Sequence, residues 1–92
     1  MKVKDYNKFR YFGYEDYYDG HTENTDKFHL GDVVILARGK RKEVGIILQC
    51  HGHNEYRTDW FGNCCETGIR FATIDEIKKY RPEIINELCT EN

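Results

Sequence analysis

The clearest hydrophobic pattern in the chain is a pair of apolar runs separated by a short polar segment. Residues 33–36 are four consecutive aliphatic residues, and residues 43–49 carry a second run that Gly45 interrupts. Runs rich in β-branched residues favour buried strands. The polar segment contains Gly39, which can adopt positive φ in a loop. We therefore predict a curled hairpin, with a bulge or a sharp bend at Gly45.

Two shorter strands are predicted after this hairpin. Between residues 55 and 60, the uncharged positions from Tyr56 to Trp60 alternate with charged ones, which is the period-two pattern of a strand. Residues 68–72 supply the next strand, and residues 62–63 form a turn between the two. The expected sheet thus continues well beyond the hairpin.

A helix is predicted to begin directly after the last of these strands. Thr73 and Glu76 have the spacing of a capping box, in which each side chain bonds the other residue's backbone. Pro82 cannot continue that helix, but it suits the first turn of a second one. The apolar residues of these two helical segments are Ile74, Ile77, Tyr80, Ile84, Ile85 and Leu88.

The first 27 residues show no sustained period. Aromatic and charged residues are mixed, and two glycines interrupt them. We predict an aromatic and acidic arm over residues 1–27 that is only partly ordered.

The hairpin residues resemble a known architecture. Residues 31–36 and 44–47, with Gly39 between them, resemble the glycine-and-hydrophobic hairpin of KOW-type and other SH3-like small β-barrels. Residues 71–77 are similar to the strand and short helix that end several small bacterial and phage barrel proteins. The resemblance implies a mainly β, SH3-like barrel over residues 28–92, closed by short C-terminal helical turns. Members of this group bind RNA, DNA, peptides, or ribosomal or polymerase partners, and a shared barrel does not transfer any one of these functions.

Composition narrows the class of protein. The chain has 92 residues, enough for one domain, and a net charge of −2, whereas a generic nucleic-acid binder is clearly basic. Its apolar runs are all shorter than the roughly 18 residues that span a bilayer, and its N-terminus lacks an apolar signal core. We therefore expect a cytoplasmic protein whose four cysteines are reduced thiols.

The positive charge of the chain is concentrated in the predicted hairpin loop. Cations in such a loop can contact a phosphate backbone or an acidic protein surface, and nearby aromatic rings can stack on bases. The alternative is a solvated loop tip that serves solubility. The candidate binding residues are Arg38, Lys40, Arg41, Lys42, Tyr56 and Trp60.

Thiols and imidazoles also occur in two neighbouring segments. Cys50 and His53 have the two-residue gap that allows both side chains to reach one zinc ion, and Cys64 and Cys65 follow in the next segment. Adjacent cysteines lack that gap, so free thiols are the alternative.

The same residue types raise the possibility of a nucleophilic site. A thiol of Cys64 or Cys65, an imidazole of His51 or His53 and the carboxylate of Asp59 would supply nucleophile, base and orienting acid. The local sequence resembles no known nucleophile turn, so we do not expect an enzyme.

The sequence thus predicts a non-catalytic binding module, with a protein partner favoured over nucleic acid by the charge. The alternatives are a KOW-like nucleic-acid-binding domain that uses the basic loop, and a small zinc-stabilised domain. No cofactor is expected. Binding that weakens steeply with salt would favour the nucleic-acid alternative.

Overall fold

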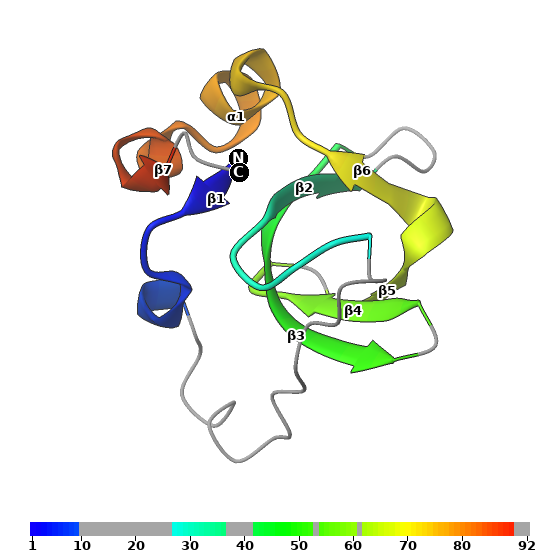
Figure 1. The fold of residues 1–92 in the computed structure, drawn as a ribbon. Helices are drawn as coiled ribbons and strands as arrows, with labels where there is room; N and C mark the ends of the chain where they lie inside the picture. Colours follow the sequence, from blue (N-terminus) through cyan, green and yellow to red (C-terminus); the bar gives the residue numbers. More distant parts are fainter. Residues whose placement is uncertain (10–26, 37–41, 53, 61, 90–92) are drawn as a thin grey trace.

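The computed structural model describes residues 1–9, 27–36, 42–52, 54–60 and 62–89, which form two antiparallel sheets and short helices (Figure 1). Five strands form one sheet in the order β5-β4-β3-β2-β6, and β1 pairs with β7 in the other. The strands are β1 Lys2–Val3, β2 Val33–Leu36, β3 Val44–Gly52, β4 Glu55–Thr58, β5 Asn63–Cys65, β6 Ile69–Phe71 and β7 Leu88–Cys89. The helix is α1 Ile74–Tyr80, and the 3-10 helices are η1 Tyr6–Phe9, η3 Glu66–Gly68 and η4 Pro82–Glu87. The prediction of a mainly β protein with C-terminal helical turns is confirmed.

The five-stranded sheet is strongly curled, which gives it an inner and an outer face (Figure 1). Successive side chains of a strand point to opposite faces, so each strand of the hairpin contributes to both. The buried residues inside the curl are Phe28, Val34, Ile47, Cys50, Tyr56 and Ile69. Those outside it are Val33, Ile35, Val44, Ile46 and Leu48, which pack with Val3, Ile77 and Ile84. Burial on both faces explains the continuous apolar runs of β2 and β3.

The predicted hairpin is present, but its bulge lies elsewhere. β2 pairs with the first residues of β3 in unbroken register, and Gly45 lies opposite Val34. The prediction of a bulge at Gly45 is therefore wrong. The register shifts twice instead, both times within the pairing of β3 with β4: between Cys50 and Gly52, and between Ile47 and Gln49, just beyond the residues of β3 that pair with β2. An extra residue at such a shift bends the strand and so helps the sheet to curl.

A strand lies where the sequence predicted a turn. Asn63 begins β5, and its three residues pair with Arg57, Tyr56 and Glu55 of β4. The strand before this turn ends at Thr58, two residues earlier than expected. The extra strand brings this sheet to five strands.

The predicted capping box is confirmed at the start of α1. The Glu76 amide donates to the Thr73 hydroxyl at 3.2 Å, and the Thr73 amide donates to the Glu76 carboxylate at 2.9 Å. Arg70 of β6 donates twice to the same carboxylate, at 2.8 and 2.6 Å. These bonds, with that of Arg70 the largest cause, lower the pKa of Glu76 from 4.5 to about 2. The cap thus ties the helix to the end strand of the sheet.

This lowered pKa makes a prediction for acid stability. A carboxyl whose pKa is lower in the folded state stabilises that state above its ordinary pKa and loses this contribution as the pH falls to the folded-state value. Between pH 4.5 and about 2, the melting temperature of the wild type should therefore fall more steeply than that of Glu76→Gln. Asp75→Asn, which removes the neighbouring carboxyl, is the control in calorimetry. Parallel curves for the wild type and Glu76→Gln would contradict this prediction.

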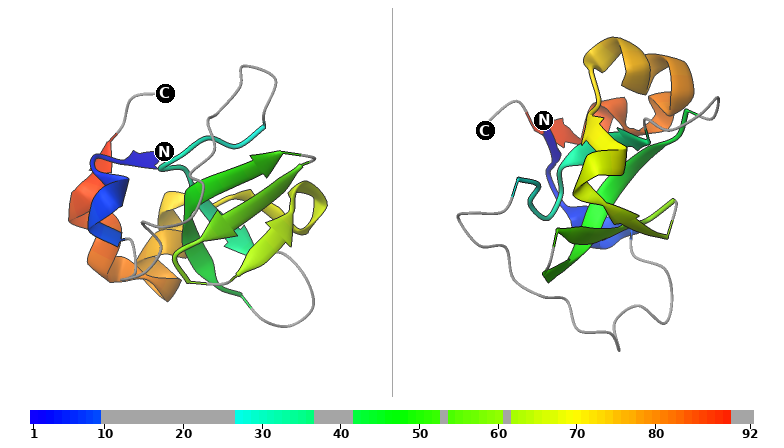
Figure 2. Two further views of the ribbon diagram at one scale, coloured as in Figure 1. Left: turned by 90° about the horizontal axis from the view of Figure 1, so that it is seen from below. Right: turned by 90° about the vertical axis from the view of Figure 1, so that its right-hand side faces the viewer.

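The first residues of the chain pack beside the last described ones. Lys2 and Val3 pair with Cys89 and Leu88, and the Lys4 amide donates to the Glu87 carbonyl at 2.8 Å. Figure 2 shows β1 and β7 side by side in both views. Val3 is buried in the hydrophobic cluster on the outer face of the curled sheet. Residues 10–26 of the predicted arm lie outside the described residues. Within the described residues there is no helix that could span a membrane.

Candidate binding site

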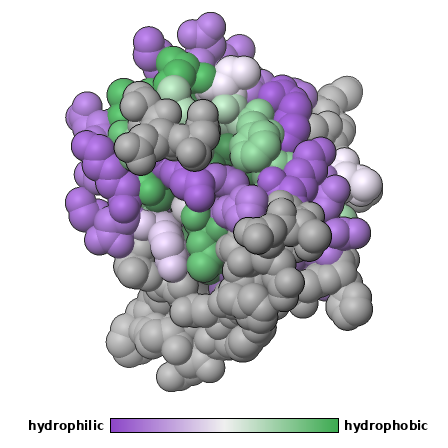
Figure 3. All heavy atoms as spheres, in the orientation of Figure 1, coloured by the Kyte–Doolittle hydropathy of each residue, from purple (hydrophilic) through white to green (hydrophobic). Residues whose placement is uncertain are grey.

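Exposed aromatic rings are the most prominent surface feature of the described chain. On the face seen in Figure 3, hydrophobic residues reach the surface in small areas separated by hydrophilic ones. The large hydrophobic side chains left exposed in the described part are those of Trp60, Phe71 and Tyr80, at 59, 44 and 40%. Trp60 is the largest and the most exposed of them.

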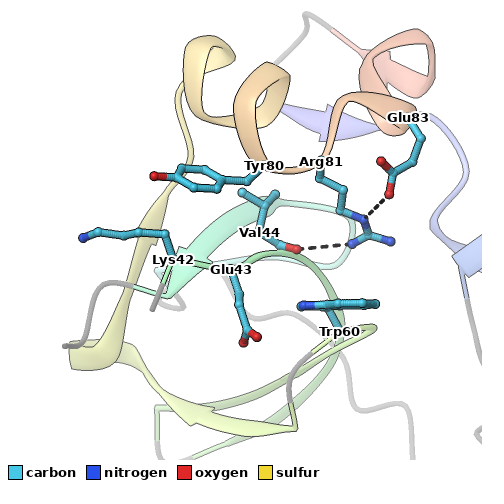
Figure 4. Close-up of a pocket in the computed structure, with 7 residues that line it drawn as sticks. All are labelled: Lys42, Glu43, Val44, Trp60, Tyr80, Arg81 and Glu83. Carbon is cyan, nitrogen blue, oxygen red and sulfur yellow. Dashed lines mark hydrogen bonds and ion pairs between the residues drawn. The ribbon is translucent and has the colours of Figure 1, made fainter. Parts of the chain in front are cut away.

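Trp60 and Tyr80 line a common hollow of about 290 Å³ (Figure 4). The hollow lies where the start of β3, the segment after β4 and the junction of α1 with η4 meet. Its lining residues are Lys42, Glu43, Val44, Trp60, Tyr80, Arg81 and Glu83. Three segments far apart in the sequence therefore build one concave site, which we call the Trp60 groove.

One lining residue of the Trp60 groove, Arg81, is held in place by a buried ion pair with Asp59. The Arg81 guanidinium donates to both carboxylate oxygens of Asp59, at 2.9 and 2.5 Å. The Asp59 side chain is only 3% exposed and that of Arg81 only 14%. Asp59 also accepts the Ile46 amide at 2.9 Å, and Arg81 donates to the Val44 carbonyl at 3.4 Å. The pair joins the C-terminal helical segments to the sheet.

Arg81 also organises the rings and carboxylates around it. Its guanidinium carbon lies 5.9 Å from the Trp60 ring centroid and 5.8 Å from that of Phe9, both within the range of cation–π contacts. Its Nε donates to Glu83 at 3.3 Å. Burial acts to lower the pKa of Arg81, but the hydrogen bonds and charges of Asp59 and Glu83 outweigh it and raise that pKa. Arg81 is therefore a permanent cation whose charge is already neutralised within the protein.

The structure separates the residues predicted for binding. Lys42 and Trp60 are exposed and line the same groove. Tyr56 is buried inside the curl, where its ring lies 5.4 Å from Phe28 in an edge-to-face arrangement. A ring in that position is not open to a base, so the described structure does not support stacking on Tyr56. The remaining predicted residues, Arg38, Lys40 and Arg41, lie outside the described residues.

The predicted zinc residues are partly brought together. Cys50 and Cys64 both lie opposite Tyr56, one on each side of it in the sheet. Two strand spacings separate them, so their Cα atoms are roughly 9–10 Å apart with a tyrosine between them. Within the described residues, no three His, Cys, Asp or Glu side chains are grouped to hold a metal ion. His53 lies outside the described residues.

The thiols of Cys50 and Cys64 make hydrogen bonds to backbone carbonyls instead. The Cys50 thiol donates to the Phe28 carbonyl at 3.9 Å, and the Cys64 thiol donates to the Tyr56 carbonyl at 3.5 Å. Burial, and then the nearby Cys65, raise the pKa of Cys64 to about 11, which keeps its thiol protonated at neutral pH. Asp59, the acid considered for a nucleophilic site, is bonded to Arg81.

Sequence reasoning did not identify the groove itself. Asp59 and Arg81 are 22 residues apart and belong to different elements, so no local spacing connects them. The one local signal is Pro82, which ends α1 at Tyr80 and so places Arg81 at a junction. No protein-family model matches this chain, and no curated protein or solved structure matches it. The geometry of the groove therefore carries the functional argument.

Proposed function

We propose that the five-stranded sheet is an SH3-like small barrel that serves as a non-catalytic binding module for a protein partner. Three features support the fold: the order β5-β4-β3-β2-β6, the 3-10 helix η3 between β5 and β6, and the strong curl of the sheet. Along the chain, β2 is the first of these five strands and β6 is the last. The two pair antiparallel with each other, which is the pairing that brings the ends of an antiparallel meander together and allows it to close.

The observation that carries the binding function is the position of Trp60. A tryptophan that is 59% exposed lines a groove in which another lining residue, Arg81, is held by a buried ion pair. Aromatic residues in fixed positions bury a large area at little entropic cost, and Trp, Tyr and Arg dominate the binding energy of protein interfaces. The Trp60 groove contains all three types of side chain, which favours it as an anchor point.

Charge favours a protein over nucleic acid at this groove. Glu43 and Glu83 line it together with Lys42, and the Arg81 charge is balanced by Asp59. Carboxylates at the rim repel phosphates, and the whole chain carries a net charge of −2. A polypeptide carries both charged and apolar side chains, so it can match a groove that is lined by charged residues and by aromatic rings.

Peptide selection on phage tests this proposal. A random peptide library is panned against the full chain, and the affinity of enriched peptides is measured for the wild type and Trp60→Ala. Loss of an interface anchor costs about 2 kcal/mol or more, so we expect Trp60→Ala to weaken binding roughly thirtyfold. Lys78→Ala, on the exposed surface of α1, is the control. Enrichment of no peptide, or of peptides that bind Trp60→Ala unchanged, would refute the proposal.

A nucleic-acid partner is the second candidate, favoured by one observation. Exposed Lys42 lines the same groove as Trp60 and directly follows the basic residues Arg38, Lys40 and Arg41 in the chain. Single-stranded RNA would then bind with an affinity that falls steeply with salt. A flat salt response would dismiss this candidate.

A further inference from the structure

A second hollow lies on a different part of the molecule, where β1, the start of β2 and the end of β6 meet. It has a volume of about 480 Å³, within the range of ligand-sized sites. Its lining residues are Met1, Lys2, Lys27, His29, Asp32 and Phe71. None of them lines the Trp60 groove. We call this hollow the Phe71 site.

The exposed charged side chains of the Phe71 site are basic. Lys27 is exposed, Lys2 is half-buried and the His29 side chain is 38% exposed. The acid, Asp32, is buried, and its Oδ2 accepts the His29 amide at 2.7 Å. Counting the two lysines against Asp32 gives 2 − 1 = +1, whereas the whole chain carries −2. The formal charge of the residues that line this hollow is therefore opposite in sign to the net charge of the protein.

An aromatic ring forms the apolar wall of the Phe71 site. The Phe71 side chain is 44% exposed, and the part that is covered contacts Phe28, with ring centroids 4.9 Å apart. Phe28 is completely buried, so this contact holds Phe71 against the interior. The rest of the ring is open to a ligand beside the basic side chains.

The geometry points to an acidic segment of a protein partner as the ligand of the Phe71 site. Its carboxylates would pair with Lys2 and Lys27, and an apolar or aromatic side chain between them would pack on Phe71. A polynucleotide fits less well, because two lysines and one ring offer few phosphate contacts and a single stacking surface. This surface is additional to the Trp60 groove and rests on different residues.

Amide-shift titrations of the full chain test this inference with a defined probe. The probe is the capped peptide Glu-Glu-Phe-Glu, and its neutral counterpart is Gln-Gln-Phe-Gln. We expect the acidic peptide to shift the amides of Lys2, Lys27, His29 and Phe71 saturably, and the neutral one to bind several-fold more weakly. Equal binding of the two peptides, or no shift at these amides, would overturn the inference.

Matched variants separate a specific site from a general charge effect. Replacing both lysines by glutamine should weaken acidic-peptide binding roughly three- to tenfold, since each exposed ion pair contributes little alone. Phe71→Ser should weaken it roughly tenfold through lost ring contact. The control, Lys4→Gln with Lys78→Gln, removes the same charge outside the Phe71 site and should bind as the wild type. A control that loses as much affinity as the double variant would refute the site.

Two further measurements decide the class of partner and keep the two surfaces apart. A short oligothymidylate that displaces the peptide and binds more tightly would overturn the assignment of a protein ligand. Trp60→Ala should leave the acidic peptide's affinity unchanged, because Trp60 does not line this hollow. Melting curves of each variant show whether a lost affinity reflects a lost fold.

Discussion

Arg81→Met is expected to lower the free energy of unfolding by about 3–5 kcal/mol, which is the usual cost of removing one partner from a buried ion pair. The cause is Asp59, whose side chain is 3% exposed and would lose the guanidinium that pairs with it in the buried ion pair. The methionine retains much of the apolar stem, so the loss reports chiefly on the charge. Urea denaturation followed by tryptophan fluorescence and circular dichroism measures it.

A double-mutant cycle with Asp59→Asn identifies the ion pair as the source of this effect. Asparagine can still accept the Ile46 amide, which donates to Asp59 at 2.9 Å, and it leaves no buried charge. We therefore expect Arg81→Met combined with Asp59→Asn to be less destabilised than the sum of the single variants. Strict additivity would show that Arg81 stabilises the fold through packing on Trp60 and Phe9 rather than through Asp59.

Phe28→Ala should be about as damaging, with a loss of roughly 3–5 kcal/mol typical of a large ring removed from a core. Phe28 is fully buried inside the curled sheet, where its ring meets Tyr56 on β4 and Phe71 on β6. It therefore joins strands on opposite sides of the curl. Because small domains have a total stability of about 5–15 kcal/mol, this loss is a large share of it. The denaturant midpoint measures the effect.

Two milder variants test whether this loss comes from the ring itself. Phe28→Leu keeps most of the volume and should cost clearly less than alanine. Tyr56→Phe removes the hydroxyl that accepts the Phe28 amide at 3.4 Å, with an expected cost of about 0.5–1.5 kcal/mol. A Phe28→Ala variant as stable as the wild type would mean that the curled interior does not depend on this ring.

Local chemistry made the hairpin and the helix cap predictable. Val33, Val34 and Ile35 favour a strand by their branching, and Thr73 with Glu76 satisfy one another's backbone within four residues. Both signals act over short separations, and the structure confirms both. What remained open was how these elements pair across the sheet.

The candidate site was only half predictable because it depends on where a strand ends. Alternation placed Tyr56, Thr58 and Trp60 on one face. The strand stops at Thr58, so Tyr56 and Thr58 are buried while Trp60 leaves that face and becomes exposed. Neighbouring Asp59 is buried as well, because Arg81 reaches it from the far end of the chain. Such a long-range pair has no pattern in the sequence.

The pairing of β1 with β7 has a consequence for building with this fold. Lys2 lies opposite Cys89, so these two residues near the ends of the described chain are a strand spacing apart. A domain whose ends are adjacent can be inserted into an exposed loop of a host protein through two short linkers, without distorting either the domain or the host. The Trp60 groove and the Phe71 site would then be displayed on the host as a single graft.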